Sequence, residues 1–430
     1  MRRVALFNSR KPRRPTPGDR WVRLTTLLAR HLAASGDVLV TGLGPLHYDL
    51  ALHCALAAGG PAEVVGLTAA GARAAAGRYR GLLDAPRLRL LPAGPEPPTP
   101  TERDRAVAEA ADEVLVVEAR AGGAVERLAW EALLRGRPVL VCPADDTAGT
   151  AGNRRLLAAG AEELWSEGLG AEAAAFRAAC AVRRTAVPAP TFPVPPAGTA
   201  AGDWPWVVHF TRACAGEFPG ETRAEHLAAL AGADDPRFHD ARRALERILG
   251  EGRIRSAGRL IRGGHAVVSF TAAHPHDLAR LARWARHLGR MTFEPYGVGV
   301  RRAAATRLGL RPAVYGPPGL QAALPEGERY LFQVRRGRRD EWAPEREWRA
   351  RGDVELRRWP ADEVVVVVPT RVEAAELRSV TSFPVLALEA WPAQLPADSS
   401  AGGVVGSASA GGSSGAGTGV WAAGARGGSP

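Results

Sequence analysis

Two pairs of glycines, Gly42 with Gly44 and Gly122 with Gly123, each stand between an apolar run and a helical pattern. Glycine lets a backbone approach a phosphate closely, and the start of the following helix offers free N–H groups. Both turns therefore predict phosphate-binding loops. The first does not complete a G-x-G-x-x-G pattern, because His47 stands at the third glycine. A plain strand-to-helix turn is therefore an equal alternative there.

A basic rim is expected beside these turns. Its predicted phosphate-binding residues are Ser9, Arg10 and Lys11 after the first apolar run, and Arg103 and Arg105 before a later one. The carboxyl ends of parallel strands share one edge, where guanidinium groups suit phosphate oxygens. Asp49 is expected at this site too, with a helix N-cap as an equal alternative. His53, one helical turn on, is more simply a buried hydrogen-bonded residue than a ligand.

The elements that must position these residues follow from the hydrophobic pattern. Strands are predicted at residues 3–7, 38–40, 64–67, 113–118 and 138–142, and helices at residues 21–32, 49–59, 103–111, 124–134 and 152–160. Strands without polar alternation, separated by helices, indicate a parallel sheet covered on both faces. The first part of the chain is therefore predicted to be an α/β domain.

The second half has a mixed pattern. Strands are predicted at residues 206–211, 266–270, 296–300, 312–315, 363–369 and 384–388, and helices at residues 240–250 and 275–288. This mixture predicts a separate α+β domain. Residues 345–349 form a dense charged–aromatic segment, Glu-Arg-Glu-Trp-Arg. Its plainest reading is a strand with cross-strand ion pairs around a buried Trp348.

Changes in composition mark the domain boundaries. A proline-rich linker at residues 186–204 separates a first domain at residues 1–185 from a second at residues 205–391. Residues 392–430 are mostly glycine, serine and alanine, with few large apolar side chains. Such a segment cannot bury enough surface to fold, so a disordered tail is predicted.

Charge and cysteine usage narrow the functional classes. The formal net charge of the 430 residues is +11, and Lys11 is the only lysine. This balance favours acidic partners, nucleic acid first, with a solvated basic surface as the alternative. The four cysteines are scattered, which argues for a reducing cytoplasm and against a zinc site. No run of about 18 apolar residues exists, so no membrane span is expected. No metal is expected and no cofactor is required.

The first 165 residues or so resemble the Rossmann-like domain of the DNA-processing protein A family, called DprA or Smf. The matching segments, in chain order, are residues 9–12 (its G-S-R box), 41–53 (S-G-L-A-x-G-I-D-x-x-x-H), 103–105 and 111–119 (R-N-R and a strand ending in Glu-Ala), and 136–143 and 152–161 (its closing boxes). Asn8, His47, Tyr48, Asp104 and Ala144 depart from the family pattern. The chain is thus expected to be a divergent relative.

The resemblance implies a Rossmann-like parallel-sheet fold that holds single-stranded DNA on its basic strand-end edge. It also implies DNA processing or recombination, with a recombinase as partner, and it leaves self-association open. No residue pattern in this domain requires a catalytic function.

The second half weakly resembles abortive-infection and toxin-associated domains, with a leading H-F-T at residues 209–211 and the E-x-E-W-R box at residues 345–349. Its opening is also similar to ADP-ribosyltransferase toxins of the DarT type. That resemblance implies that His209 and Thr211 bind NAD and that Glu345 or Glu347 is the catalytic acid.

Two functions from different classes therefore stand. The first is a cytoplasmic DprA-like protein that binds single-stranded DNA through its first domain. The alternative is a phage-defence effector, in which the first domain senses a nucleotide and the second uses NAD.

Overall fold

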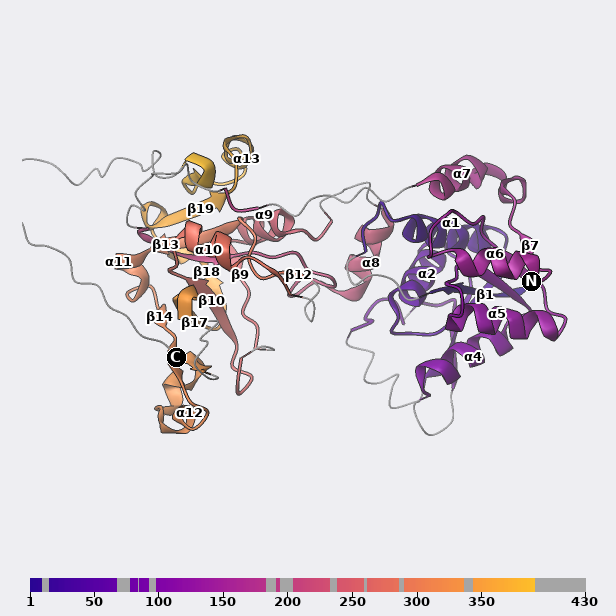
Figure 1. Cartoon of the computed structure of the whole chain (residues 1–430), viewed down its shortest axis with the longest axis horizontal. Coiled ribbons are helices and arrows are strands. Elements are labelled where there is room, and N and C mark those ends of the chain that lie inside the picture. The colour runs from indigo at the N-terminus through magenta and orange to yellow at the C-terminus, as the bar shows by residue number, and fades with distance from the viewer. Residues whose placement is uncertain are drawn as a thin grey trace, which may run out of the picture.

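The structure is a computed structural model that describes residues 1–9, 15–67, 78–83, 85–92, 98–182, 191–193, 204–232, 238–258, 261–285, 290–335 and 343–390. It contains two seven-stranded sheets, each at the centre of its own layered unit. Figure 1 shows the two units side by side, with the helix α8 (Arg223–Gly232) between them. An α/β domain followed by a mixed-sheet domain is the fold class that the sequence predicts.

The first sheet, sheet A, is parallel throughout, with the strand order β4-β3-β2-β1-β5-β6-β7. Its strands are β1 (Arg3–Asn8), β2 (Val38–Thr41), β3 (Ala62–Leu67), β4 (Leu88–Pro92), β5 (Glu113–Glu118), β6 (Val139–Val141) and β7 (Glu162–Glu163). All the residues of β2 and β5 are buried, as expected of strands covered on both faces. The chain winds outward in opposite directions from β1, so the topological switch point lies between β1 and β5.

Helices cover both faces of sheet A. On one face α1 (Arg20–Ala34), α2 (Leu46–Ala57) and α7 (Ala173–Ala181) share a core with α8. On the other face lie α4 (Pro100–Ala110), α5 (Ala124–Leu134) and α6 (Ala151–Ala158), with a core of their own. The helix at residues 49–59 was predicted three residues too late, because the chain enters α2 directly after Pro45.

The second sheet, sheet B, is mainly antiparallel, in the order β14-β17-β10-β8-β13-β19-β20, and only the β19–β20 pair is parallel. Its strands are β8 (Trp206–Phe210), β10 (Val267–Thr271), β13 (Gly297–Arg301), β14 (Arg311–Pro312), β17 (Glu347–Arg351), β19 (Val364–Val368) and β20 (Val385–Ala387). The helices α9 (Ala241–Glu251), α11 (Arg302–Ala305) and α13 (Arg371–Leu377) pack on one face. The short helix α10 (Pro275–Leu281) packs on the other.

Smaller elements complete the second domain. They are the strand pairs β9 (Arg253–Ile254) with β18 (Val354–Glu355), β11 (Trp284–Ala285) with β12 (Arg290–Met291), and β15 (Val314–Gly316) with β16 (Phe332–Val334), and the helix α12 (Leu320–Ala323). Its 3₁₀ turns are η2 (Glu326–Leu331), η3 (Ala343–Glu345), η4 (Leu356–Arg358), η5 (Ala361–Glu363) and η6 (Leu388–Ala390). The turn η1 (Ser166–Glu172) belongs to the first domain.

The helix predicted at residues 275–288 is wrong beyond Leu281. There the backbone turns to an extended conformation at Ala282, and Trp284 pairs with Met291 in the β11–β12 hairpin. Hydrogen bonds between Arg283 and Thr292 close this hairpin from the other side. Cross-strand pairing has therefore overridden a helical sequence pattern, which propensity alone could not anticipate.

The helix α8 follows the linker in the sequence but packs with the first domain. Its Leu227 and Leu230 are buried in the core that also contains Leu24 and Leu50 of α1 and α2. Figure 1 shows α8 beside α1 and α2, apart from sheet B. The first domain's core is thus completed by residues that lie beyond the proline-rich segment.

Several predicted segments lie outside the described residues, namely Arg10, Lys11, the tail at residues 392–430 and most of the linker. Within the linker Phe192 is described, and its ring packs edge-on against Phe210 at 5.4 Å in the second domain's core.

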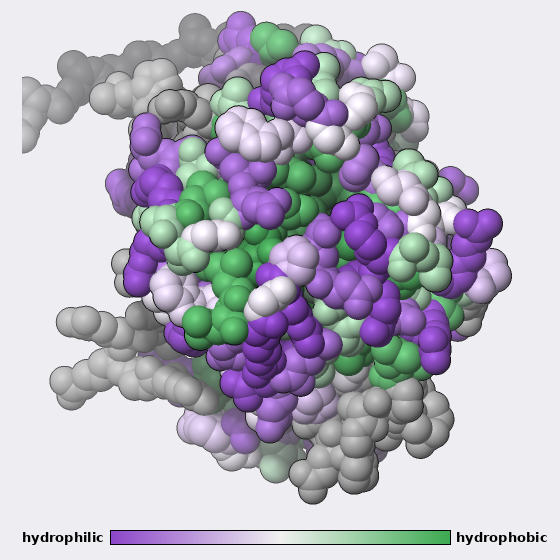
Figure 2. Space-filling view, turned by 90° about the vertical axis from the view of Figure 1, so that its right-hand side faces the viewer, coloured by the Kyte–Doolittle hydropathy of each residue, from purple (hydrophilic) through white to green (hydrophobic). Residues whose placement is uncertain are grey.

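No helix among the described residues is long and apolar enough to cross a membrane. Figure 2, which looks at the end of the first domain, shows an apolar area framed by hydrophilic side chains.

Candidate functional site

The switch point of sheet A is built from the ends of β1 and β5. The backbone N–H of Ser9 donates to the carbonyl of Glu118 at 2.8 Å, and the Ser9 hydroxyl accepts the N–H of Arg120 at 3.0 Å. Ser9, a predicted phosphate ligand, therefore also fixes the loop that leaves β5. In doubly wound sheets the crevice at this position is where ligands bind.

A buried ion pair lies next to this crevice. Arg20 of α1 donates to Glu118 at 2.9 Å, and both side chains are about one-tenth exposed or less. Arg20 also donates to the carbonyls of Pro143 and Cys180, which ties α1 to the end of β6 and to α7. Burial alone would lower the pKa of Arg20, but the Glu118 carboxylate raises it overall. Arg20 is therefore a fixed positive charge at the switch point.

Asn153 of α6 holds the end of β5 in place. Its side chain accepts the N–H of Ala119 at 2.6 Å and donates to the carbonyls of Val117 and Cys142 at 3.1 and 2.9 Å. Gly152 makes this approach feasible, because a Cβ there would lie 2.8 Å from the Ala119 carbonyl. The G-x-N pattern noted in the sequence thus has a structural cause.

Asn8, at the end of β1, is the exception in this crevice. It is 1% exposed, yet neither its amide nitrogen nor its amide oxygen has a hydrogen-bond partner among the described residues. A buried polar group without a partner costs about 1–3 kcal/mol, so such groups call for a specific explanation. Nearby, the exposed guanidinium of Arg120 has no carboxylate partner among the described residues.

The second glycine turn has its N–H groups occupied. Gly122, at φ 70°, donates its N–H to the carboxylate of Glu126, and Gly123 donates to the carbonyl of Arg120 at 3.0 Å. Glu126 is itself paired with Arg155 at 3.0 Å. These two N–H groups are thus bonded within the protein, and the turn's role as a phosphate cradle remains a prediction.

The first glycine turn is closed by Asp49. Its carboxylate is 0% exposed and accepts the N–H of Gly44 at 3.0 Å, the hydroxyl of Tyr79 at 3.0 Å, and two nitrogens of Arg223 from α8 at 2.6 and 3.0 Å. Asp49 is not the N-cap, because α2 begins three residues earlier. Its position inside the core makes it a junction between the two halves of the chain.

Arg103 and Arg105 are separated from each other. Arg103 lies over Tyr48, 5.5 Å from its ring centre, and a Cβ on Gly42 would lie 3.0 Å from the Arg103 side chain. The structure therefore brings Arg103 to the first glycine turn, although Asp104 pairs with it at 2.7 Å.

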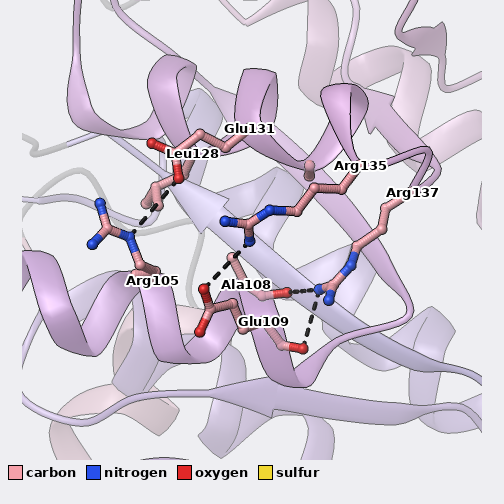
Figure 3. Close-up of a pocket in the computed structure, with 8 residues that line it drawn as sticks. Arg105, Ala108, Glu109, Leu128, Glu131, Arg135 and Arg137 are labelled. Atoms are coloured by element: carbon pink, nitrogen blue, oxygen red, sulfur yellow. Dashed lines mark hydrogen bonds and ion pairs between the residues drawn. The ribbon is translucent and has the colours of Figure 1, made fainter.

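Arg105 instead lines a small pocket between α4 and α5, where it faces Glu131 at 3.8 Å (Figure 3). In the same pocket Arg135 pairs with Glu109 at 3.3 Å, and Arg137 donates to the last carbonyls of α4. The arginines of this pocket therefore have their partners within the protein.

His53 belongs to no cluster of metal-ligand side chains among the described residues, and burial lowers its pKa.

The second domain gathers three of its four predicted catalytic residues. The Nδ1 of His209 lies 2.8 Å from the carbonyl of Ser269, and the Ser269 hydroxyl donates to Glu347 at 2.8 Å. Burial lowers the pKa of His209 to about 4. Because a carbonyl only accepts, Nδ1 carries the proton and Nε2 of the neutral ring presents a lone pair.

The backbone carbonyl of Glu345 accepts the hydroxyl of Thr271, the residue that pairs with Glu347 across the β10–β17 ladder. Burial raises the pKa of Glu345 to about 7, although the charge of Arg212 opposes this. Arg212 is half-buried, its Nε has no hydrogen-bond partner, and burial lowers its pKa. A carboxyl group that titrates near neutrality beside a cation is typical of acid–base sites.

Thr211 and the charged–aromatic segment have structural roles as well. The Thr211 hydroxyl donates to the backbone carbonyls of Ala241 and Tyr296, so it does not join the cluster. In β17, Glu347 pairs with Arg349 at 2.9 Å on its own strand. Trp348 is only partly buried, and the fully buried side chain is Arg349, which binds the carbonyls of Tyr330 and Phe332.

Comparisons with known proteins bear on the first domain. No family model and no curated protein matches the chain. Among solved structures, DprA from Streptococcus pneumoniae is 21% identical over 38% of this chain and 58% of its own, with a TM-score of 0.31. DprA from Helicobacter pylori, described for its single-stranded DNA binding mode, is 22% identical over 37% and 74%, with a TM-score of 0.30. The chain thus spans little more than half of the first of these structures.

The molybdenum cofactor carrier protein of Chlamydomonas reinhardtii is also similar, at 14% identity over 42% of this chain and 97% of its own, with a TM-score of 0.27. The N-terminal part of the chain is the part that resembles DprA, as the sequence predicts. The parallel sheet and its switch point, described above, establish the fold independently of these likenesses.

Sequence reasoning missed several residues of these sites. Arg20 and Arg212 were passed over because one arginine in an arginine-rich chain carries no positional signal. Asn8 did carry a signal in the sequence, because it stands where the related family pattern has glycine.

Proposed function

We propose that the first domain binds single-stranded DNA at the strand-end edge of sheet A, across the switch point between β1 and β5. The observation that supports this most directly is Asn8, a buried amide without a partner in the crevice where such sheets bind ligands. An amide can donate to a phosphate or accept from a base or sugar.

The charge distribution agrees with an anionic ligand. Arg120 is exposed beside Ser9 without a carboxylate partner among the described residues, and the whole chain carries a net charge of +11. Phosphate contacts supply most of the affinity for a nucleic acid strand. A role in recombination with a recombinase, and self-association, belong to the same proposal and extend it.

The test is a salt titration of the full chain binding a labelled single-stranded oligonucleotide, followed by fluorescence anisotropy. If Arg120 contacts a phosphate, Arg120→Ala should shallow the slope of log K against log salt by about 0.7. Asn8→Ala should weaken binding while leaving this slope unchanged. Arg135→Ala is the matched control, because Arg135 follows the end of α5 at the opposite edge of the sheet and pairs with Glu109. Equal slopes for Arg120→Ala and Arg135→Ala, or no binding at low salt, would overturn the proposal.

A second candidate function is group transfer from NAD in the second domain. It is favoured by Glu345, whose pKa burial raises to about 7 and which interacts with the charge of Arg212. Arg212 would suit the pyrophosphate of NAD, and Glu345 could exchange a proton with the acceptor. Incubation of the full chain with NAD should release nicotinamide, and Glu345→Gln should abolish this while the exposed Glu326→Gln does not. Intact NAD in the presence of DNA acceptors would exclude this activity.

A further inference from the structure

Three metal-ligand side chains meet beside α8, outside both sites described above. Glu221 lies just before the helix, His226 lies in it, and His239 follows it. One ligand atom from each lies within 4.8 Å of the others. All three side chains are one-tenth exposed or less.

His226 carries the argument, because it is completely buried and its ring nitrogens have no hydrogen-bond partner among the described residues. Its side chain is 0% exposed, and neither Nδ1 nor Nε2 makes a hydrogen bond. Nδ1 faces the Oε2 of Glu221 at 3.9 Å, which is too far for a hydrogen bond.

His239 is arranged as metal-binding histidines usually are. Its Nδ1 lies 2.9 Å from the carbonyl of Gly216, so Nδ1 carries the proton. The lone pair of Nε2 then points at the Oε1 of Glu221, 3.3 Å away. A ring nitrogen lone pair and a carboxylate oxygen this close need either a proton or a metal ion between them.

The surroundings hold His239 in this orientation. Its ring is stacked against Phe218 at 4.0 Å and Phe238 at 4.3 Å. Its backbone is held at φ 51°, a conformation that non-glycine residues rarely adopt and that clusters at functional sites. Phe218 also donates its N–H to Glu221 at 2.7 Å, which fixes the carboxylate.

We propose that Glu221, His226 and His239 bind one divalent transition-metal ion, with zinc as the best match. Two imidazoles and one carboxylate suit Zn²⁺, which takes nitrogen ligands at about 2.0–2.1 Å and oxygen at about 2.0–2.2 Å. Ligand atoms around such an ion lie about 3.3 Å apart in tetrahedral geometry, so the side chains need only close slightly. A fourth position remains for water.

The site would fasten the segment that joins the two domains. Its ligands bracket α8, and Arg223 of the same helix binds Asp49 of the first domain. An ion that links residues 221, 226 and 239 would close the loop around α8 and stabilise its docking. The metal therefore acts on the packing of α8 and adds no step to either proposed function.

The first experiment uses the full chain, stripped with a chelator and titrated with Co²⁺ and then Zn²⁺. We expect one equivalent of Co²⁺ to give the visible ligand-field absorption of a low-symmetry site, and Zn²⁺ to displace it. Glu221→Gln and His239→Gln should weaken binding by more than the roughly 10–100-fold that the loss of an outer-shell partner costs. Glu225→Gln on the same helix and His265→Gln are the matched controls and should bind as the unaltered chain does.

Thermal unfolding of the same proteins shows whether each variant folds. Zn²⁺ should raise the Tm of the unaltered chain and of both controls, but not of Glu221→Gln, which keeps the shape of the carboxylate. A folded chain that takes up neither ion overturns the proposal, and a doubly protonated His239 by NMR at neutral pH would then identify the proton as the cation. Equal metal binding by Glu221→Gln and the unaltered chain would also overturn it.

Discussion

Asp49 in the first domain is a fully buried charged group and Arg212 in the second is a half-buried one, but only Asp49 has a hydrogen-bond partner at every polar atom of its side chain. Four donors from the glycine turn, Tyr79 and Arg223 reach its carboxylate. Arg212 has an Nε without a partner, and its neighbour Glu345 has a pKa raised to about 7 by burial. The comparison separates charges that hold the fold from charges that are available for chemistry.

The largest expected effect is at the satisfied site. Asp49→Asn removes the carboxylate that accepts two hydrogen bonds from the buried Arg223 and leaves it only Glu217, at 3.0 Å. Breaking a buried pair in this way costs about 3–5 kcal/mol. Urea unfolding of the full chain at pH 7 measures the loss. The double variant Asp49→Asn with Arg223→Met should recover part of it, because the buried charge that lost its Asp49 partner is removed. A loss below about 1 kcal/mol for Asp49→Asn would mean that the pair does not hold α8 in place.

Two buried asparagines sharpen the comparison within one crevice. Asn153→Ala removes three hydrogen bonds at the end of β5, which should cost about 3 kcal/mol at about 1 kcal/mol each. Asn8→Ala removes none and should change the free energy of unfolding by less than about 1 kcal/mol. Urea titrations of the two variants, run in parallel, measure both changes in the free energy of unfolding. If the two substitutions cost the same, Asn8 has a structural partner, and the explanation offered for its position fails.

The most gradual effect is a pH dependence at Glu345. Its folded-state pKa of about 7 lies above the ordinary value of 4.5, so the folded protein holds a proton that the unfolded chain has lost. This contribution to stability is fully present below about pH 4.5 and is lost as the pH rises to about 7. The difference of about 2.5 between the two pKa values corresponds to a loss on the order of 3 kcal/mol, spread over this pH range. Glu345→Gln should remove this part of the slope in unfolding experiments between pH 4.5 and 8. The exposed Glu326→Gln should keep it, and a slope unaffected by Glu345→Gln would contradict the raised pKa.

The sequence predicted most of sheet A because its signal is local. Five of its strands are short apolar runs, and α5 was predicted at its observed bounds, residues 124–134. The same pattern located β8, α9 and β19 in the second domain. It missed α8, because the residues that α8 packs against lie on α1 and α2, far away in the sequence.

The sites were predicted less well, since their chemistry depends on partners that only the fold brings together. The position of Arg103 at the first glycine turn was expected, but the burial of Asp49 was not, because its partner Arg223 lies 174 residues away. The scattered cysteines argued against zinc, yet the candidate metal ligands are histidines and a glutamate whose spacing, 221, 226 and 239, matches no familiar motif. Spacing in the sequence says little when a loop and a helix fold back on each other.

Because α8 docks on the first domain, that domain includes residues from both sides of the linker. A polypeptide that stopped at residue 185 would lack Leu227 and Leu230 and would expose the apolar surface that they cover on α1 and α2. Its Asp49 would keep a charge without a counter-ion inside the core. A single backbone cleavage between residues 185 and 204 should accordingly yield two fragments that remain together, because the downstream fragment carries part of the upstream one's interior. The core of the first domain therefore extends beyond the linker as far as Phe238.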